Sequence, residues 1–195
     1  MSTSNVIKNN KEKSIDQKST VLWFTGLPCS GKTTISTELH SALRQQNLLT
    51  YILDGDQVRK GLNSDLDFSK KDRTENIRRT GEVAKLFAHA GFIIIVAFIS
   101  PFRKDRDQVR NNLESEQFIE IYLDCPLEEC EKRDVKGHYK RARKGELPCF
   151  TGISSPYEPP LNPELSLKTH LQSSTECVKK ITHYLAQFNR IPPEI

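Results

Sequence analysis

The chain has no hydrophobic stretch long enough to cross a membrane. Its longest uninterrupted apolar run, residues 92–99, has the length of one strand, whereas a membrane-spanning helix needs about 20 apolar residues. Residues 1–19 are polar and contain two acidic residues and no arginine, so they match neither a secretory signal nor an organelle transit peptide. We expect residues 1–19 to form a disordered tail and the chain to have no membrane partner.

Cysteine is scarce, and its spacing suggests no pairing. The five cysteines are an odd number, and no two of them are spaced as Cys-x-x-Cys. The usual signatures of a disulfide framework and of a zinc site are therefore missing. The simplest interpretation is a set of reduced thiols in the cytoplasm.

A block of consecutive basic residues is also missing. The net charge is only +4, and many basic side chains gather in two short clusters, at residues 73–79 and 133–144. Local clusters of this kind favour an anionic small molecule, whereas binding along a nucleic acid needs a more extended basic surface. The sequence therefore predicts no nucleic-acid partner.

Apolar strand-like runs alternate with helix-like segments along residues 20–190, which we expect to form a single domain. This alternation is typical of α/β proteins with a parallel sheet and helices on both faces. The predicted strands are residues 21–25, 49–53, 92–99, 118–123 and 165–169, and the predicted helices are residues 32–46, 71–90, 103–113, 127–133 and 174–188. Residues 134–163 show little of either pattern and are rich in basic residues, glycine and proline. We expect a functional lid there.

A phosphate-binding loop follows the first predicted strand. Residues 26–33 read Gly-Leu-Pro-Cys-Ser-Gly-Lys-Thr, a full G-x-x-x-x-G-K-[ST] motif between a strand and a helix. In such a loop, backbone N–H groups converge on phosphates, Lys32 reaches the β- and γ-phosphates and Thr33 joins the magnesium shell. We therefore expect ATP and Mg²⁺ here, with the nucleotide held by Gly26, Leu27, Pro28, Cys29, Ser30, Gly31, Lys32, Thr33 and Thr34.

Two aspartates end the second predicted strand. Asp54 and Asp56 flank Gly55 and, because the carboxyl ends of parallel strands share one edge of a sheet, we expect both to face the phosphate-binding loop. Asp54 would share the metal with Thr33, and Asp56 would accept the proton of an attacking hydroxyl. The other interpretation is a plain turn, in which Asp-Gly pairs are common.

The central strand, residues 92–99, carries no acidic residue. The metal-binding aspartate that often stands on such a strand is therefore missing, and its role falls to Asp54 and Asp56. Pro101 ends the strand and places Ser100 at the same edge of the sheet.

Basic and aromatic residues complete the candidate site. Arg73 and Asn76 share one face of the predicted helix 71–90, although a charge-rich helix face is more often solvated. Phe68 and Phe150 lie in polar loops, where they either stack on the two faces of a purine or pack onto the core. Residues 134–137 fit the D-x-x-G pattern of GTPases, but no Asn-Lys-x-Asp occurs, and we reject a GTPase.

Six blocks in unbroken order resemble the adenylyl-sulfate kinase family. They are GLPCSGKTT (26–34), DGDQVR (54–59), DRTENIRR (72–79), FISPFR (98–103), CEKRDVKG (130–137) and FTGISSPYEPP (150–160). The resemblance covers about residues 20–183 and implies a P-loop fold. It also implies an enzyme that uses ATP and Mg²⁺ to phosphorylate the 3′-hydroxyl of adenosine 5′-phosphosulfate (APS) in sulfate assimilation, and a cytoplasmic homodimer.

The resemblance also implies roles for single residues. It supports catalytic roles for Lys32, Asp54, Asp56 and Ser100, nucleotide contacts that include Arg133, and APS contacts from Asp56, Arg59, Phe68, Arg73, Asn76, Ile99, Ser100, Lys136 and Phe150. Ser100 matches a serine often described in this family as a phosphoserine intermediate. We expect direct in-line transfer instead, because a neutral serine needs its own base. Two alternatives stay open: another small-molecule or nucleoside-monophosphate kinase of this fold, and a nucleotide-sensing module without catalysis.

Overall fold

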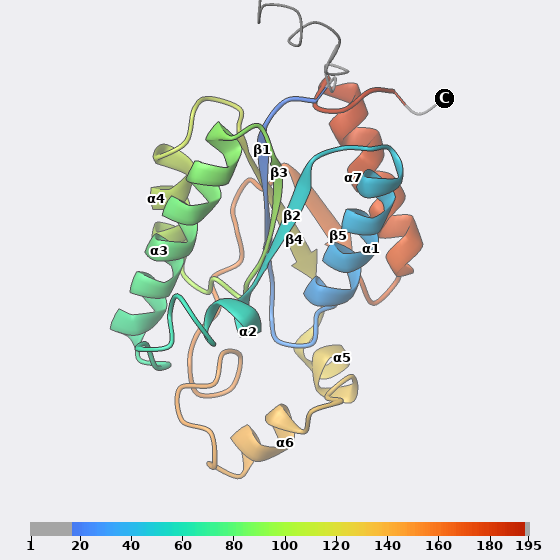
Figure 1. The fold of residues 1–195 in the computed structure, drawn as a ribbon. Coiled ribbons are helices and arrows are strands. Elements are labelled where there is room, and N and C mark those ends of the chain that lie inside the picture. Colours follow the sequence, from blue (N-terminus) through green and yellow to red (C-terminus); the bar gives the residue numbers. More distant parts are fainter. Residues whose placement is uncertain (1–16, 194–195) are drawn as a thin grey trace, which may run out of the picture.

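The structure, a computed structural model, describes residues 17–193. A five-stranded sheet in the order β2-β3-β1-β4-β5 forms its centre, and every neighbouring pair of strands is parallel. Helices cover both faces of the sheet (Figure 1). The predicted fold class is therefore confirmed. Within the described residues, no helix is both long and apolar enough to cross a bilayer.

The strands are β1 (Thr20–Thr25), β2 (Thr50–Asp54), β3 (Ile93–Ala97), β4 (Phe118–Asp124) and β5 (Leu165–Lys168). The helices are α1 (Lys32–Gln45), α2 (Gly55–Val58), α3 (Lys70–His89), α4 (Arg103–Asn111), α5 (Leu127–Lys132), α6 (His138–Arg143) and α7 (Ser174–Gln187). All five predicted strands and all five predicted helices are present, with ends that differ by at most two residues.

The central strand β1 contributes to a hydrophobic core on each side of the sheet. Its side chains alternate between the two faces: Leu22 and Phe24 pack with apolar residues of α1 and α7, and Val21 and Trp23 pack with those of α3 and α4. Figure 1 shows these helix pairs on opposite faces. The apolar residues 21–24 suit this position because neither face of the strand meets water.

Two short helices, α2 and α6, are not predicted from the sequence. They contain four and six residues, fewer than the window of about 11 residues in which a helical period can be recognised. Helix α6 lies inside the segment 134–163. It begins after Gly137, whose φ is 67°, and the Asp134 carboxylate accepts hydrogen bonds from the backbone N–H groups of His138 and Lys140, at 2.8 and 3.1 Å.

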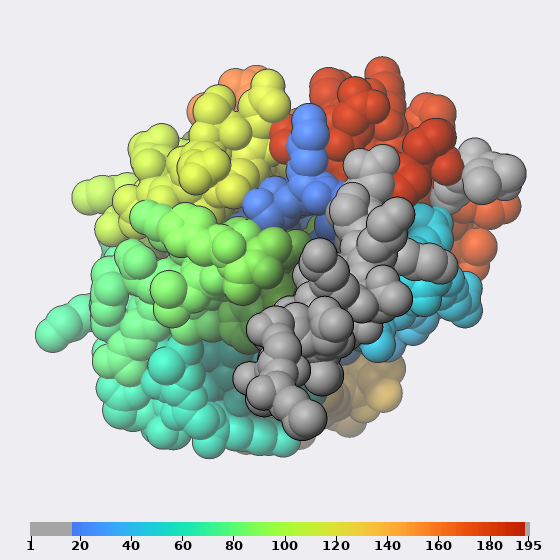
Figure 2. Space-filling model, turned by 45° about the horizontal axis from the view of Figure 1, so that its top comes forward, coloured from blue at the N-terminus to red at the C-terminus, as the bar shows by residue number. Residues whose placement is uncertain are grey.

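The first described residues are attached to the amino-terminal edge of the sheet. The side chain of Gln17 donates to the carbonyl oxygens of Leu49 and Gly91, at 3.2 and 2.7 Å, and accepts from the backbone N–H of Leu49 at 2.7 Å. The N–H of Lys18 donates to the carbonyl of Arg190 at 2.9 Å. Figure 2 looks toward this edge, where the start of the described chain, in blue, emerges beside the red C-terminal region. The rest of the predicted tail, residues 1–16, lies outside the described residues.

Candidate active site

A cavity of ≈ 620 Å³ lies at the carboxyl ends of the strands, the edge at which parallel sheets bind ligands. Most predicted site residues line it, namely Pro28, Cys29, Gly31, Lys32, Thr33, Thr34, Asp54, Asp56, Arg59, Phe68, Arg73, Asn76, Ile99, Ser100, Arg133 and Lys136. Four predicted site residues do not line it: Gly26, Leu27, Ser30 and Phe150. The first three still belong to the loop that forms one wall.

The loop between β1 and α1 curls tightly at two glycines, one where a side chain does not fit and one whose backbone is left-handed. A Cβ at position 26 would lie 2.9 Å from the carbonyl oxygen of Leu123 and 2.8 Å from Oγ of Ser30. Gly31 has a φ of 100°, in the left-handed region, directly before α1. The loop therefore ends on the N-terminus of a 14-residue helix, where free N–H groups and the helix dipole favour an anion.

Lys32 bridges this loop from the first turn of α1. Its ammonium donates to the carbonyl oxygens of Gly26 and Leu27, at 2.9 and 2.6 Å, and to Oγ of Ser30 at 3.4 Å. Burial lowers the pKa of Lys32 to about 8. Its charge is thus poorly compensated, and an anionic phosphate at the cavity wall would stabilise it.

The residue that ends β2, Asp54, holds two groups with its carboxylate. Oδ1 accepts from the backbone N–H of Asp56 at 2.9 Å and so caps α2, whereas Oδ2 accepts from Oγ1 of Thr33 at 3.3 Å. The Asp-Gly-Asp sequence is therefore both a local turn and a bridge to the phosphate-binding loop. The two interpretations left open by the sequence are compatible.

The second aspartate, Asp56, faces the lid segment. Its Oδ2 lies 2.9 Å from the ammonium of Lys136, and this pairing raises the pKa of Lys136. Both side chains are largely exposed, at 75% for Asp56 and 65% for Lys136. A carboxylate that is accessible from the cavity can accept a proton from a bound hydroxyl.

The oxygen atoms of Thr33 and Asp54 fit a magnesium ion. Hard oxygen donors are what Mg²⁺ prefers, and it commonly takes only one or two protein ligands beside water and substrate phosphates. Among residues 17–193, no three His, Cys, Asp or Glu side chains gather as metal ligands. These residues therefore suit a metal that is shared with a nucleotide, and they do not form an all-protein cage.

Arg73 is buried rather than solvated. Its exposed fraction is 7%, and its guanidinium donates to the carbonyl oxygens of Phe68 and Cys149 and to Oγ1 of Thr151, at 2.9, 2.6 and 2.9 Å. The solvated helix face that charge-rich helices usually show is therefore not found here. Arg73 lines the cavity, and it also attaches residues 149–151 to α3.

Asn76, one turn further along α3, is 4% exposed, and its Oδ1 accepts from the side-chain amide of Asn63 at 2.8 Å. The guanidinium carbon of Arg59 lies 4.5 Å from the ring centroid of Phe68, and that of Arg73 lies 5.6 Å from it. These residues therefore form a basic and aromatic wall of the cavity that the phosphate-binding loop also lines.

Only one of the two predicted purine-stacking aromatics reaches the cavity. Phe68 lines it and is 56% exposed. Phe150 instead packs against Tyr139, with ring centroids 5.0 Å apart and planes at 78°, in a small apolar cluster that joins the lid segment to the phosphate-binding loop and α5. The expectation that both rings face one purine is not met in this conformation, because Tyr139 offers Phe150 an apolar partner.

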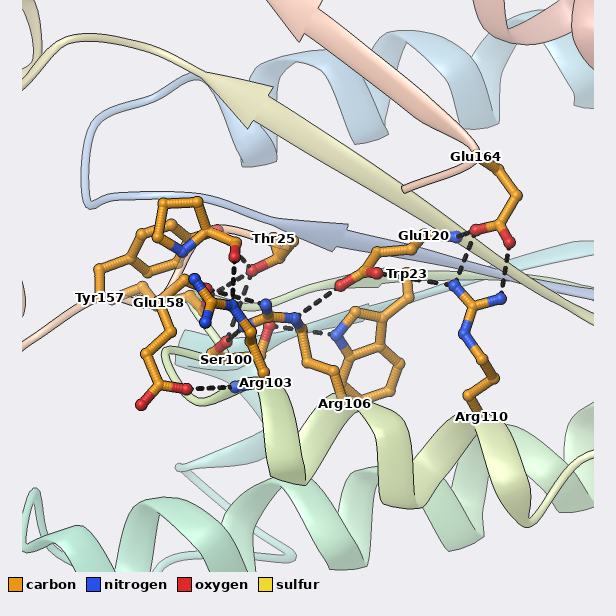
Figure 3. A network of polar contacts seen from close by, with 12 residues as sticks. Trp23, Thr25, Ser100, Arg103, Arg106, Arg110, Glu120, Tyr157, Glu158 and Glu164 are labelled. Atoms are coloured by element: carbon orange, nitrogen blue, oxygen red, sulfur yellow. Dashed lines mark hydrogen bonds and ion pairs between the residues drawn. The ribbon is translucent and has the colours of Figure 1, made fainter. Parts of the chain in front are cut away.

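Ser100 stands at the edge of the cavity in a strained backbone conformation. Its φ is 40° although it is not glycine, and it is 2% exposed. Its hydroxyl accepts from the indole N–H of Trp23 at 3.1 Å, and its carbonyl accepts from Nη1 of Arg106 at 2.6 Å (Figure 3). No carboxylate or imidazole of the described residues is hydrogen-bonded to its hydroxyl, so the serine has no general base in contact with it.

Sequence reasoning missed several residues that shape the site. Thr169, directly after β5, lines the cavity and accepts from Nη2 of Arg133 at its carbonyl, at 2.6 Å. Its place at a strand end was a usable signal. The Tyr139 hydroxyl donates to the carbonyl of Pro28 at 3.0 Å and joins α6 to the phosphate-binding loop. This contact spans 111 residues, and no local pattern indicates it.

Comparison with known proteins shows one consistent family. A family model described as "Adenylylsulphate kinase" matches residues 18–168. An adenylyl-sulfate kinase of Clostridium acetobutylicum is 55% identical over 180 residues, which cover 92% of this chain and 90% of the relative.

Solved structures of that family have the same fold. The Mycobacterium tuberculosis APS kinase in complex with AMPPNP and APS is 40% identical and superposes with a TM-score of 0.81, covering 87% of this chain and 98% of its own. A hexameric APS kinase from Thiobacillus denitrificans is 30% identical with a TM-score of 0.69, covering 90% of this chain and 30% of its own.

Proposed function

The chain belongs to the adenylylsulphate kinase family and phosphorylates adenosine 5′-phosphosulfate with ATP, and we propose which of its residues carry out each part of the transfer. The observation that supports the assignment is that the phosphate-binding loop, both strand-end aspartates and Ser100 line a single cavity. Phosphoryl transfer depends mainly on holding two substrates in line and on balancing charge. One cavity with these groups on its walls meets both needs.

ATP is assigned to the side of the cavity formed by the loop 26–33 and the start of α1. The backbone N–H groups of the loop hold the phosphates, and Lys32 leaves its loop carbonyls to reach the β- and γ-phosphates. Arg133, which lines the same cavity, contributes a further positive charge on the lid side.

Thr33 and Asp54 are the residues that would hold Mg²⁺, directly or through water. When bound there, the ion would neutralise the negative charge of the phosphates during transfer. The hydrogen bond between Thr33 and Asp54 indicates that both oxygens already converge on one point.

APS is assigned to the opposite wall. Arg59, Arg73 and Asn76 hold its anionic and polar groups, Phe68 stacks on its adenine, and Ile99 and Ser100 form the end of the wall. Of the two arginines, Arg73 has fewer donors to spare, because its contacts with Phe68, Cys149 and Thr151 already use three N–H groups, whereas Arg59 uses only Nη1. The cavity-facing role of Arg73 therefore rests on its two remaining N–H groups and its charge.

Asp56 is the proton acceptor in this assignment. The 3′-oxygen of APS forms a bond to the γ-phosphorus, the bond from that phosphorus to the β,γ-bridging oxygen breaks, and the hydroxyl proton passes to the Asp56 carboxylate. Lys136, now paired with Asp56, is placed to turn toward the transferred phosphoryl group as this happens.

Ser100 lines the substrate wall and forms no covalent intermediate in this scheme. Its hydroxyl is engaged by Trp23, and a serine that is not activated by a base is a weak nucleophile. Direct in-line transfer needs only Asp56 as the acceptor of one proton.

Residues 134–156 are proposed as the part of the chain that moves as a lid. This is shorter than the stretch 134–163 expected from the sequence, because residues from Tyr157 onward are hydrogen-bonded to β1, to the start of α4 and to the residues before it. Closure would bring Lys136 onto the phosphates beside Arg133, which already lines the cavity, and would exclude water from them.

The remaining proposals concern the setting of the enzyme. We propose a homodimer, as the family resemblance implies, and light scattering should then give twice the 22.3 kDa of one chain. We also propose a cytoplasmic enzyme of sulfate assimilation, a location that suits five free cysteines. Fractionation of the source cells with an antibody to the chain tests the location.

The decisive experiment measures ADP release with a panel of acceptors. APS, AMP, shikimate and gluconate are each offered with ATP and Mg²⁺, and the product of the APS reaction is identified by mass and by nuclear magnetic resonance of the ribose. We expect turnover with APS and phosphate at its 3′-oxygen. Equal or greater turnover with AMP or a sugar would refute the assignment.

A further inference from the structure

Arg106 is a buried arginine in α4 whose three nitrogens are all engaged. The residue is 1% exposed. Nε donates to Oε1 of Glu120 at 2.6 Å, Nη1 to the carbonyl of Ser100 at 2.6 Å, and Nη2 to the carbonyl of Glu158 at 2.8 Å. Figure 3 shows the guanidinium between these groups. Burying a guanidinium is costly unless charge and hydrogen bonds compensate it, and here both do.

The contact with Ser100 fixes the wall of the substrate cavity. Ser100 has left-handed backbone, with a φ of 40°, which a non-glycine residue keeps only when its surroundings hold it there. Arg106 holds its carbonyl, Trp23 holds its hydroxyl, and Thr25 holds the carbonyl of the preceding Ile99 at 2.8 Å. Of these three donors, only Arg106 is charged.

The contact with Glu158 fixes the end of the proposed lid. Besides accepting from Arg106, Glu158 accepts from the backbone N–H of Arg103 at 2.8 Å, and its own N–H donates to the carbonyl of Pro101 at 2.8 Å. The adjacent Tyr157 hydroxyl lies 2.9 Å from Oγ1 of Thr25. One guanidinium therefore joins the Ser100 wall to the segment where the lid returns to the sheet.

The contact with Glu120 connects Arg106 to a chain of alternating charges. Glu120, in β4, also lies 3.5 Å from Arg110, which pairs through two hydrogen bonds with Glu164 just before β5. Arg110 is hydrogen-bonded to neither Ser100 nor Glu158, although it belongs to the same network (Figure 3). The two arginines thus share an environment and differ in whether they touch the cavity wall.

We propose that Arg106 is a positioning residue for the acceptor substrate, because it holds Ser100 and the lid end in one fixed relation. The inference rests on the proposed role of Ser100 as part of the APS wall. Arg106 itself does not line the cavity, so its effect passes through Ser100. A reacting group displaced by about 1 Å can lose on the order of a hundredfold in rate, so a wall that shifts should weaken both binding and alignment of the acceptor.

The test compares two matched substitutions, Arg106→Lys and Arg110→Lys. Each keeps the positive charge and removes the planar fork of donors, but only the first releases Ser100. We expect Arg106→Lys to raise the KM for APS about tenfold or more while the KM for ATP stays within about twofold, since Arg106 does not contact the nucleotide loop. Arg110→Lys should leave both KM values near those of the wild type, even where it lowers the melting temperature.

A second readout needs no turnover. Trp23 is the only tryptophan of the chain, and its indole N–H is bonded to Ser100, so its fluorescence reports on the wall directly. We expect the emission maximum to shift in Arg106→Lys and to stay unchanged in Arg110→Lys. An enzyme that fails to phosphorylate APS would refute the proposed function, whereas this comparison tests the coupling of Arg106 to Ser100 on its own.

Each result bears on the proposal. Equal changes in APS KM and in emission for both substitutions, or a change of melting temperature alone in Arg106→Lys, would overturn it. Should Arg106→Lys not fold, Glu120→Gln perturbs the guanidinium without removing it, because the amide oxygen still accepts from Nε. The same selective rise in APS KM, of smaller size, is then expected, and an unchanged KM would again overturn the proposal.

Discussion

The ammonium of Lys136 lies 2.9 Å from Oδ2 of Asp56, so a lysine of the lid segment is paired with the proposed proton acceptor. An exposed pair of this kind contributes at most about 1 kcal/mol. It is therefore weak enough to be exchanged when substrates enter. The pair orders the lid segment beside the cavity and still leaves Asp56 available to a hydroxyl group.

Replacing the proposed base should affect chemistry and leave binding largely intact. Asp56→Asn keeps the shape of the side chain and removes its capacity to take a proton, so we expect kcat to fall about 100-fold or more with a near-normal KM for APS. Initial-rate kinetics measure both constants. Asp65→Asn is the matched control, since Asp65 also pairs with a basic residue, Arg79, but lies outside the cavity. Near-normal turnover of the Asp56 variant would remove the assignment.

Arg73→Ala should weaken acceptor binding and also loosen the lid segment. The guanidinium contributes to the cavity wall and holds Cys149 and Thr151, so we expect an APS KM about tenfold higher or more and a lower melting temperature. Arg78→Ala serves as the control, because Arg78 lies on the same helix and pairs only with exposed Glu75. An unchanged KM for APS would take Arg73 out of the substrate site.

Ser100→Ala distinguishes direct transfer from a phosphoserine route. Direct transfer predicts that kcat stays within about tenfold of the wild type, because the hydroxyl takes no part in bond making, whereas loss of a required nucleophile costs several orders of magnitude. The same variant should alter Trp23 emission, since the indole loses its acceptor. Incubation with γ-labelled ATP and no acceptor should leave the wild-type chain unlabelled. Labelling at Ser100 would contradict direct transfer.

Binding of a triphosphate should take up protons near pH 8. Burial lowers the pKa of Lys32 to about 8 in the free enzyme, and neighbouring phosphates favour the charged form and raise this pKa. At pH 8 about half of the Lys32 side chains are then neutral before binding, so uptake should approach about half a proton. Calorimetry of AMPPNP binding in buffers of different ionisation enthalpy measures it. Uptake that persists in Lys32→Met would assign it to another group.

The two aromatic residues should respond differently to truncation. Phe68→Ala removes a ring that lines the cavity, and stacking on a base is worth about 1–3 kcal/mol, so we expect the APS KM to rise about tenfold. Phe150→Ala removes the partner of Tyr139 and should chiefly lower the melting temperature. Equal effects of both substitutions on KM would instead mean that Phe150 joins the purine when the lid closes.

The sequence predicts the sheet and most of the cavity correctly because the relevant signals are local. The phosphate-binding loop is a contiguous motif, and Asp54, Asp56 and Ser100 directly follow apolar runs, so the geometry of a parallel sheet brings them together. The cavity includes all three. No knowledge of side-chain packing is needed for this part.

The parts that the sequence does not predict depend on contacts between distant residues. Nothing near Phe150 in the sequence indicates that it packs on Tyr139, and nothing near Arg73 indicates that it holds residues 149–151. The sequence around Arg106 indicates only an ordinary residue of a charged helix. Its hydrogen-bond acceptors, however, lie in three separate segments of the chain. Such roles follow only once the topology is known.

The Gln17 side chain has a practical consequence for shortening the chain. Its side-chain amide joins the residues that precede β2 and β3 through three hydrogen bonds to Leu49 and Gly91. These bonds lie at the end of the sheet remote from the catalytic cavity. A truncation that begins at residue 17 keeps these hydrogen bonds, whereas one that begins at residue 18 leaves three backbone groups without them, namely the N–H and carbonyl of Leu49 before β2 and the carbonyl of Gly91 before β3. A fusion partner is therefore better joined ahead of Gln17 than directly to β1.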